Sequence, residues 1–204
     1  MDERYVRVNA SSLILRERRD LLDATIAGIA DVMKLQGRES KLILPGNEKQ
    51  AKLLRDIDIH ATQRQSEVDP DDSSEHSFTQ YKVGSYAAHL AHYEKSVKSP
   101  DIQDYVITNK DFYTDGEDYV FGMTLVPEQL SVQSLARVVM GIRGYDAQDI
   151  MARQIARHEF GYLSGFDTQK ELPTLLKSID KQSLEVYTNY LKSTAHRSVR
   201  LFNR

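Results

Sequence analysis

The chain has 204 residues, a formal net charge of −3 and 28% charged residues, values that are ordinary for a globular domain with a substantial core. They exclude the strongly basic character of many nucleic-acid-binding proteins. No apolar run approaches the roughly 18 residues of a membrane-spanning helix, and the N-terminal MDERYVRVNASS has no signal-peptide core. The absence of cysteine excludes disulfides, thiol nucleophiles and cysteine-ligated zinc. We therefore expect a cytoplasmic protein with no nucleic-acid or membrane partner.

Strand and helix patterns alternate through the first part of the chain. Residues 12–36 carry apolar side chains at helical spacing and stop at Gly37, which predicts one long helix. Two short apolar runs predict strands, and a further helical pattern opens at a capping asparagine; these segments are 4–9, 41–44 and 47–61. Residues 64–77 are polar, acidic and rich in turn-forming types, so we expect a flexible surface loop there.

More strands follow in the middle of the chain. Residues 77–99 show the helical period, and 104–109 have the composition of a buried strand. The runs 119–126 and 130–139 both favour strands, and the short PEQ segment between them indicates a hairpin or two closely joined strands.

A helix is predicted to begin near residue 147, capped by Asp146 and ended by Gly165 in a left-handed conformation. His158 and Tyr162 lie four residues apart and therefore share one face of this helix. Residues 171–196 are mostly helical in pattern. Together these segments predict an α/β (α+β) fold: one domain over residues 1–204, with a small mixed sheet and long helices.

His158 and Glu159 match the start of HExxHxxGxxH, a pattern that builds hydrolytic zinc sites. Such a site needs three protein ligands and an open position for water. Two histidines four apart on a helix can share one ion, and the glutamate after the first can activate the water. Gly165 matches the glycine of the pattern, but Tyr162 and Thr168 occupy the positions of the other two histidines.

The donors at these positions are weak zinc ligands. The phenol of Tyr162, with an ordinary pKa of about 10, is a poor donor at neutral pH. Thr168 is weaker still, and the carboxylate of Asp167 stands one place early. These three residues and His158 are the candidate metal positions, with Glu159 as the candidate general base. Alternatively, His158 and Tyr162 pack or hydrogen-bond on a half-buried face without a metal.

Four stretches in order resemble archaemetzincins, a metzincin-like family of zinc peptidases. They are a T-x-x-D-F-Y element, a VFG element, an S-L-A-R element and ARHEFGYLSGF, which is similar to the family's HELGHLFGL helix. The matching positions are Thr108, Asp111, Phe112, Tyr113, Val120, Phe121, Gly122, Ser134, Leu135, Ala136, Arg137, His158, Glu159, Gly161, Leu163 and Gly165. The resemblance spans residues 78–166, is looser in the N-terminal third, and implies a zincin fold in one domain.

This chain departs from the family where the metals bind. It has no cysteine for the family's structural zinc, and no methionine follows Met151 to form a Met-turn. We therefore expect no cofactor and a pseudopeptidase that binds a peptide or protein partner. The resemblance places a possible peptide-binding edge strand at Ser131, Val132, Gln133 and Ser134.

Two other interpretations stay open. The first is an active metal-dependent peptidase, with zinc held by His158, Asp167 and either Tyr162 or a distant histidine, and with Glu159 as general base. The second is a purely structural or assembly role, in which His158 and Glu159 are core or interface residues.

Overall fold

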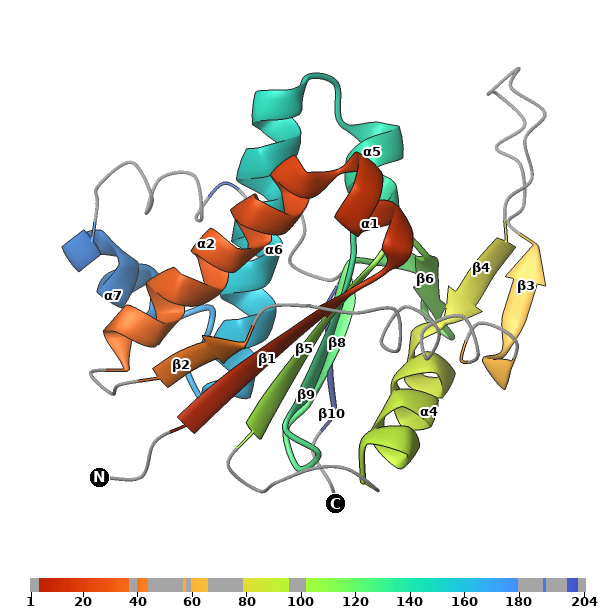
Figure 1. Ribbon diagram of the computed structural model, residues 1–204, viewed down its shortest axis with the longest axis horizontal. Helices are drawn as coiled ribbons and strands as arrows, with labels where there is room; N and C mark the ends of the chain where they lie inside the picture. Colours follow the sequence, from red (N-terminus) through yellow and green to blue (C-terminus); the bar gives the residue numbers. More distant parts are fainter. Residues whose placement is uncertain are drawn as a thin grey trace.

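The computed structural model describes residues 4–36, 40–43, 57, 60–65, 79–95, 102–179, 189 and 198–201. Two mixed β-sheets have helices packed around them (Figure 1). The larger sheet has the strand order β10-β8-β9-β5-β1-β2, and the smaller has the order β3-β4-β6-β7. The expected α/β class with mixed sheets is confirmed, and the single domain over residues 1–204 stays a prediction.

The larger sheet combines a parallel core with a reversed edge. Its strands are β1 (Arg4–Ala10), β2 (Ser40–Ile43), β5 (Ile102–Thr108), β8 (Gly122–Leu125), β9 (Leu130–Ser134) and β10 (Ser198–Leu201). Strands β2, β1, β5 and β9 are parallel, whereas β8 is antiparallel to β9 and β10 runs parallel to β8. The predicted pair of closely joined strands is therefore confirmed as β8–β9. Strand β10 was not expected from the sequence.

The smaller sheet contains one strand where a helix was expected. Its strands are β3 (Gln63–Gln65), β4 (Thr79–Lys82), β6 (Asp111–Thr114) and β7 (Glu117–Val120). Strand β4 replaces the start of the helix predicted over 77–99, because its backbone bonds β3 on one side and β6 on the other. The predicted loop over 64–77 is wrong for its first two residues, which belong to β3. The rest of that loop lies outside the described residues.

The described helices are α1 (Ser12–Glu17), α2 (Arg19–Leu35), α4 (Val83–Lys95), α5 (Ala136–Gly141), α6 (Tyr145–Leu163) and α7 (Glu171–Ile179). The single helix expected over 12–36 is interrupted at Arg18, which has φ −132° and ψ 50°. Its guanidinium donates to both carboxylate oxygens of Asp20 and to Oε1 of Gln148 on α6. Helix α5 also corrects the strand predicted over 130–139, which ends at Ser134. Most of the helix predicted over 47–61 lies outside the described residues.

A hydrophobic core lies on each face of the larger sheet. On β5, Tyr105 and Ile107 join the core that α2 and α6 complete, whereas Val106 between them faces the core beneath α4. This alternation follows the period of two in a strand. Each fully buried apolar side chain of this kind stabilises the fold by about 1.5–3 kcal/mol. The core that includes Tyr105 and Ile107 fixes α6 against the sheet, and α6 carries the candidate site.

Candidate functional site

Helix α6 packs along α2 on one side and against β8 and β9 on the other (Figure 1). It begins at Tyr145, and its N-cap is Gly144 with φ 90°. Asp146 is therefore not the cap that the sequence suggested, but it lies in the first turn, where a carboxylate is favourable beside the helix dipole. Gly165 ends the helical segment with φ 87°, the left-handed conformation that was expected.

A buried ion pair fixes α6 on α2. Nε and Nη2 of Arg157 donate to Oδ2 of Asp31 at 2.9 and 2.7 Å, and Nη1 donates to Oε1 of Gln154. The Arg157 side chain is 1% exposed and that of Asp31 is 4% exposed. Arg153, more exposed, also binds Asp31. Because Arg157 precedes His158, this pair helps to set the orientation of the candidate site.

The His158 imidazole lies against the ring of Tyr162. The ring centroids are 4.6 Å apart and the planes are inclined by 73°, which is an edge-to-face contact. His158 is buried and Tyr162 is half-buried. Burial lowers the pKa of His158 to about 4, because the imidazolium would lose its hydration. The side chain is therefore neutral near pH 7, and its expected face-sharing with Tyr162 is confirmed.

Glu159 is held inside the contact between α6 and β8. Its Oε2 lies 2.9 Å from Oγ1 of Thr124, and this hydroxyl is also 2.8 Å from Oγ of Ser131. Gly122 leaves room for the carboxylate, since a Cβ there would lie 3.1 Å from Cδ of Glu159. Glu159 is fully buried. The carboxylate is thus a hydrogen-bond acceptor within the fold, and Thr124 is a partner that the sequence analysis missed.

Asp167 caps helix α7. Its Oδ1 accepts from the backbone N–H groups of Gln169 and Lys170, both at 3.0 Å, while Oε2 of Glu171 accepts from the N–H of Asp167 at 3.1 Å. This reciprocal arrangement resembles a capping box, with the glutamate four rather than three residues after the aspartate. The next residue, Thr168, is fully buried. Its methyl group packs over Gly161, where a Cβ would approach it to 3.0 Å.

Strand β9 is an interior strand. Ser131, Val132, Gln133 and Ser134 pair with β5 on one side and β8 on the other, and all four are buried. Gln133 accepts from the hydroxyl of Tyr105 and donates to the carbonyl of Ala152 on α6. The expected peptide-binding edge at these residues is therefore wrong, because both of its backbone edges are already hydrogen-bonded. The outer neighbour of β8 is β10.

The residues at the motif positions do not fit a hydrolytic zinc ion. The donors at the three ligand positions would be one neutral imidazole, a phenol and a buried hydroxyl, while Asp167, the carboxylate next to the third position, binds backbone N–H groups. A zinc site of this class needs three nitrogen or oxygen ligands converging on one point. Within the described part of the chain, no group of three or more His, Cys, Asp or Glu side chains is arranged to hold a metal ion.

No family model and no curated protein matches the chain. Among solved structures, an archaemetzincin from Methanopyrus kandleri is similar, with a TM-score of 0.50 and 15% sequence identity over 93% of this chain and 96% of that chain. A zinc-dependent peptidase from Methanocorpusculum labreanum has a TM-score of 0.48 and 13% identity, over 79% of this chain and 81% of that chain. The resemblance suggested by the sequence motifs is thus confirmed for the fold: this chain has an archaemetzincin-like fold.

Proposed function

We propose that this protein is a pseudopeptidase: a cytoplasmic binding or regulatory protein with an archaemetzincin-like fold, which recognises a peptide or protein partner and does not hydrolyse it. The proposal rests on the fold together with the contacts made by four residues of the motif region: His158, Glu159, Tyr162 and Asp167. In this proposal the protein retains the fold of a zinc peptidase, and its motif residues contribute to packing instead of catalysis.

The observation that carries the proposal is the commitment of each motif residue to its neighbours. Tyr162 lies edge-on to the imidazole of His158, where the pattern would place a second zinc ligand. The carboxylate of Glu159 is bonded to Thr124, and Asp167 caps α7. Without a metal, Glu159 has no bound water to activate.

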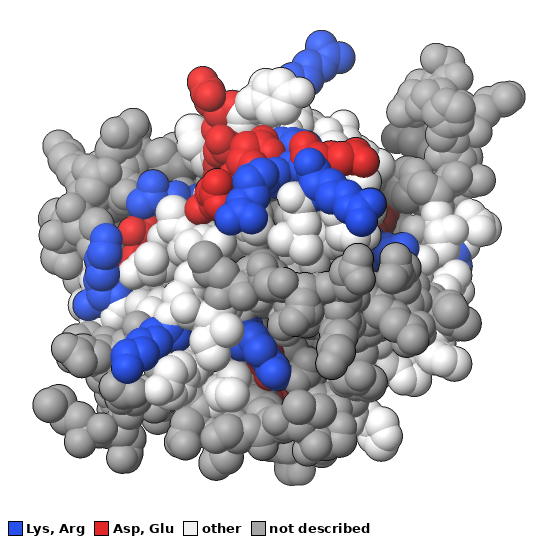
Figure 2. Space-filling view, in the orientation of Figure 1, with Lys and Arg blue, Asp and Glu red and all other residues white. Residues whose placement is uncertain are grey.

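The partner is proposed to be a peptide or protein because the charges do not favour a polyanion. Figure 2 shows basic and acidic side chains interleaved on the face that it presents. Arg18 pairs with Asp20 and Arg19 pairs with Asp23. Nucleic-acid binding relies on clustered positive charge. No helix in the described part of the chain combines the length and apolar character needed to cross a membrane.

A peptidase assay tests the proposal. The protein, purified without chelating resin and supplied with zinc, is incubated with a library of quenched fluorescent peptides, in parallel with Glu159→Gln. We expect no cleavage above buffer in either sample. Chelator-sensitive cleavage that disappears in Glu159→Gln would instead establish the alternative function, a metal-dependent peptidase with Glu159 as general base.

A further inference from the structure

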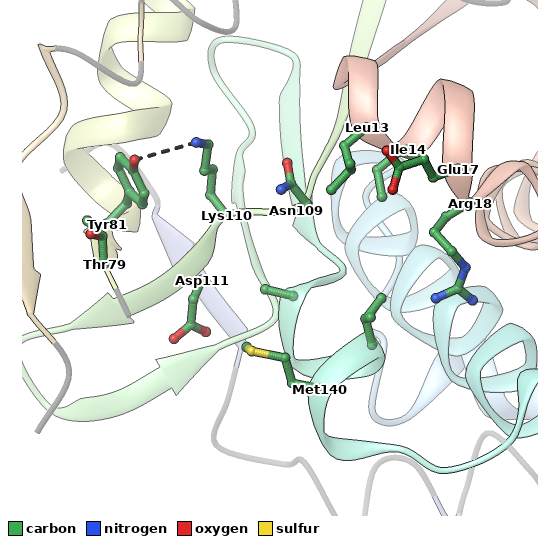
Figure 3. A pocket seen from close by; sticks show the side chains of 12 residues that line it. Leu13, Ile14, Glu17, Arg18, Thr79, Tyr81, Asn109, Lys110, Asp111 and Met140 are labelled. Atoms are coloured by element: carbon green, nitrogen blue, oxygen red, sulfur yellow. Dashed lines mark hydrogen bonds between the residues drawn. The ribbon is translucent and has the colours of Figure 1, made fainter. Parts of the chain in front are cut away.

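A cavity of about 520 Å³ opens between α1, α5, β4 and the turn that joins β5 to β6 (Figure 3). This volume is in the range of small-ligand sites. None of its lining residues belongs to α6 or to the segment 158–168. The cavity is therefore separate from the candidate site above, and the residues at the zinc-motif positions do not contribute to it.

The cavity lies where the chain connections of the larger sheet diverge. Strands β1 and β5 are parallel, so their carboxyl ends lie at the same edge, and the chain continues there into Ser11 and Asn109. Beyond β1 the chain goes on to β2 at one side of the sheet, whereas beyond β5 it goes on to β8 and β9 at the other side. In open α/β sheets, ligands bind outside the carboxyl ends of the strands at such a switch point.

One wall of the cavity is apolar and open to solvent. Leu13 and Ile14 of α1 form it together with Val139 and Met140 of α5. Leu13, Val139 and Met140 are 39%, 41% and 54% exposed. Half of the six exposed large apolar residues in the described part of the chain thus gather at one mouth. Exposed apolar side chains grouped at a concave site mark a binding surface.

Three of the four charged residues that line the cavity are bound to neighbours. The four are Glu17, Arg18, Lys110 and Asp111. Arg18 donates to both carboxylate oxygens of Asp20, at 3.1 and 2.7 Å. Both oxygens of Asp111 accept from Arg137, each at 2.7 Å. Nζ of Lys110 donates to the hydroxyl of Tyr81 at 3.5 Å and lies 5.1 Å from the centre of that ring, which is a cation–π contact. Figure 3 shows this ammonium directed to Tyr81, on the side of the cavity opposite α1.

The carboxylate of Glu17 is the exception. Glu17 is exposed at the end of α1, and its side chain makes no ion pair or hydrogen bond with another residue in the described part of the chain. Figure 3 shows this carboxylate beside Leu13 and Ile14, at the edge of the apolar wall. The adjacent Arg16 does not line the cavity. A cation at this end of the cavity would therefore meet an unpaired negative charge.

An amide donor lies between the two ends of the cavity. Ser11 Oγ donates to Oδ1 of Asn109 at 3.3 Å, which orients the amide and leaves its N–H groups to act as donors. Figure 3 shows Asn109 between Lys110 and Leu13. The carbonyl oxygen of a peptide bond is a matching acceptor for these N–H groups.

From this arrangement we infer that the cavity binds an extended peptide with an apolar and a basic residue two positions apart, the apolar side chain between α1 and α5 and the basic one at Glu17. The inference specifies the site and the partner chemistry of the proposed function, and so rests on it. Side chains two positions apart in an extended peptide point to the same side, so both enter one cavity. A carbonyl between them accepts from Asn109. The apolar side chain removes Leu13, Val139 and Met140 from water.

The test uses an acetylated and amidated pentapeptide, Ala-Leu-Ala-Lys-Ala, and three analogues with Gln or Glu in place of Lys, or Ala in place of Leu. Each is titrated into the full-length protein while backbone amide shifts are recorded by NMR. We expect the Lys peptide to bind about threefold more tightly than the Gln peptide and about tenfold more tightly than the peptide without Leu. The Glu peptide should bind more weakly than the Gln peptide. The largest shifts should fall at residues 13–17, 109–111 and 136–140.

Equal binding of the Lys and Glu peptides, or no binding at millimolar peptide, would overturn the inference. Shifts confined to α6 and β8 would also overturn it, and would leave peptide recognition by this protein intact. Hexylamine carries an apolar chain and a cation but no peptide carbonyl, so binding as tight as that of the Lys peptide would refute the assignment to a peptide. Cleavage of the peptides would contradict the proposed function and leave the preferences at the cavity standing.

Variants separate the charge from the apolar wall. Glu17→Gln should abolish the preference for the Lys peptide over the Gln peptide, whereas Glu117→Gln on β7, outside the cavity, is the matched control and should keep it. Met140→Ser should weaken all three Leu-containing peptides. Its control is Ile150→Ser, because Ile150 is 48% exposed on α6 and does not line the cavity. Lys110→Met should keep the order of the peptides. A preference for Lys that survives in Glu17→Gln, with the native spectrum intact, would refute the site.

Discussion

The hydroxyl of Thr124 on β8 lies 2.9 Å from the carboxylate of Glu159 on α6, so the residue that would be a catalytic base is part of a helix–sheet contact. The same hydroxyl contacts Ser131 on β9, and Gly122 makes room for the glutamate. Gly122, Thr124 and Ser131 of the sheet therefore together accommodate the buried side chain of Glu159. This matching gives Glu159 a structural role that needs no metal.

Thr124→Val should destabilise the protein by about 1–3 kcal/mol, because the buried carboxylate of Glu159 loses a hydrogen-bond partner while the side-chain shape is kept. Urea denaturation measures the change in the free energy of unfolding. Thr174→Val is the control: its hydroxyl makes an exposed bond to the carbonyl of Lys170, and the change should stay within about 0.5 kcal/mol. Equal effects of the two substitutions would show that the Thr124–Glu159 contact contributes little.

The stability should fall between neutral and mildly acidic pH because of His158. Burial lowers its pKa from 6.5 to about 4 in the folded protein. The unfolded state therefore binds the proton first as the pH falls, and stability that is complete above pH 6.5 is lost progressively towards pH 4. Between pH 7.5 and pH 5 this loss amounts to about 2 kcal/mol.

Urea denaturation at the two pH values isolates this effect by comparison with His158→Gln, which cannot titrate. The variant should lose about 2 kcal/mol less than the wild type over the same pH interval. If His158→Gln and the wild type lose stability equally, the pKa of His158 is the same in the folded and unfolded protein, and burial does not keep its imidazole neutral.

Arg157→Met should cost about 3 kcal/mol or more, because it leaves the buried carboxylate of Asp31 without its main partner. Arg19→Met provides the contrast, since its pair with Asp23 has side chains 58% and 62% exposed. Such exposed pairs contribute less than about 1 kcal/mol. Thermal unfolding of both variants gives the comparison. Similar losses in the two would mean that the α2–α6 ion pair does not anchor the helix.

Substitutions at Asp167 distinguish a helix cap from a metal ligand. Asp167→Ala should destabilise the fold by about 1 kcal/mol, whereas Asp167→Asn should be nearly neutral, because asparagine caps helices about as well as aspartate. Chemical denaturation of the two variants shows the difference. A carboxylate acting as a zinc ligand would predict the opposite pattern: Asp167→Asn would then lose bound zinc as Asp167→Ala does.

The sequence predicted the local elements better than their lateral order. Short-range patterns were enough to predict three features: the pairing of β8 with β9, the shared helix face of His158 and Tyr162, and the left-handed conformation of Gly165. The position of β9 inside the sheet could not be predicted in this way, because it depends on β5 and on the reversed strand β8 beyond it. A strand's own residues do not determine which neighbours it receives.

Two further differences have local physical causes. The helical spacing of apolar residues continues through Arg18, but the helix breaks there. The guanidinium of Arg18 donates to Gln148, which is 130 residues away in sequence, so a local pattern could not predict this contact. The role of Asp167 could have been predicted, because a capping residue followed by Glu171 and an apolar run is a helix-start signal. In the zinc pattern, the same residue stands one position before a ligand.

The central claim is that His158 and its neighbours do not hold a hydrolytic zinc ion, and metal content tests it most directly. The protein would be expressed in zinc-supplemented medium, purified without chelating resin or chelator, and analysed by inductively coupled plasma mass spectrometry beside His158→Gln. The account predicts far less than one zinc per chain and the same value in both proteins. One zinc per chain in the wild type, lost in His158→Gln, would contradict it.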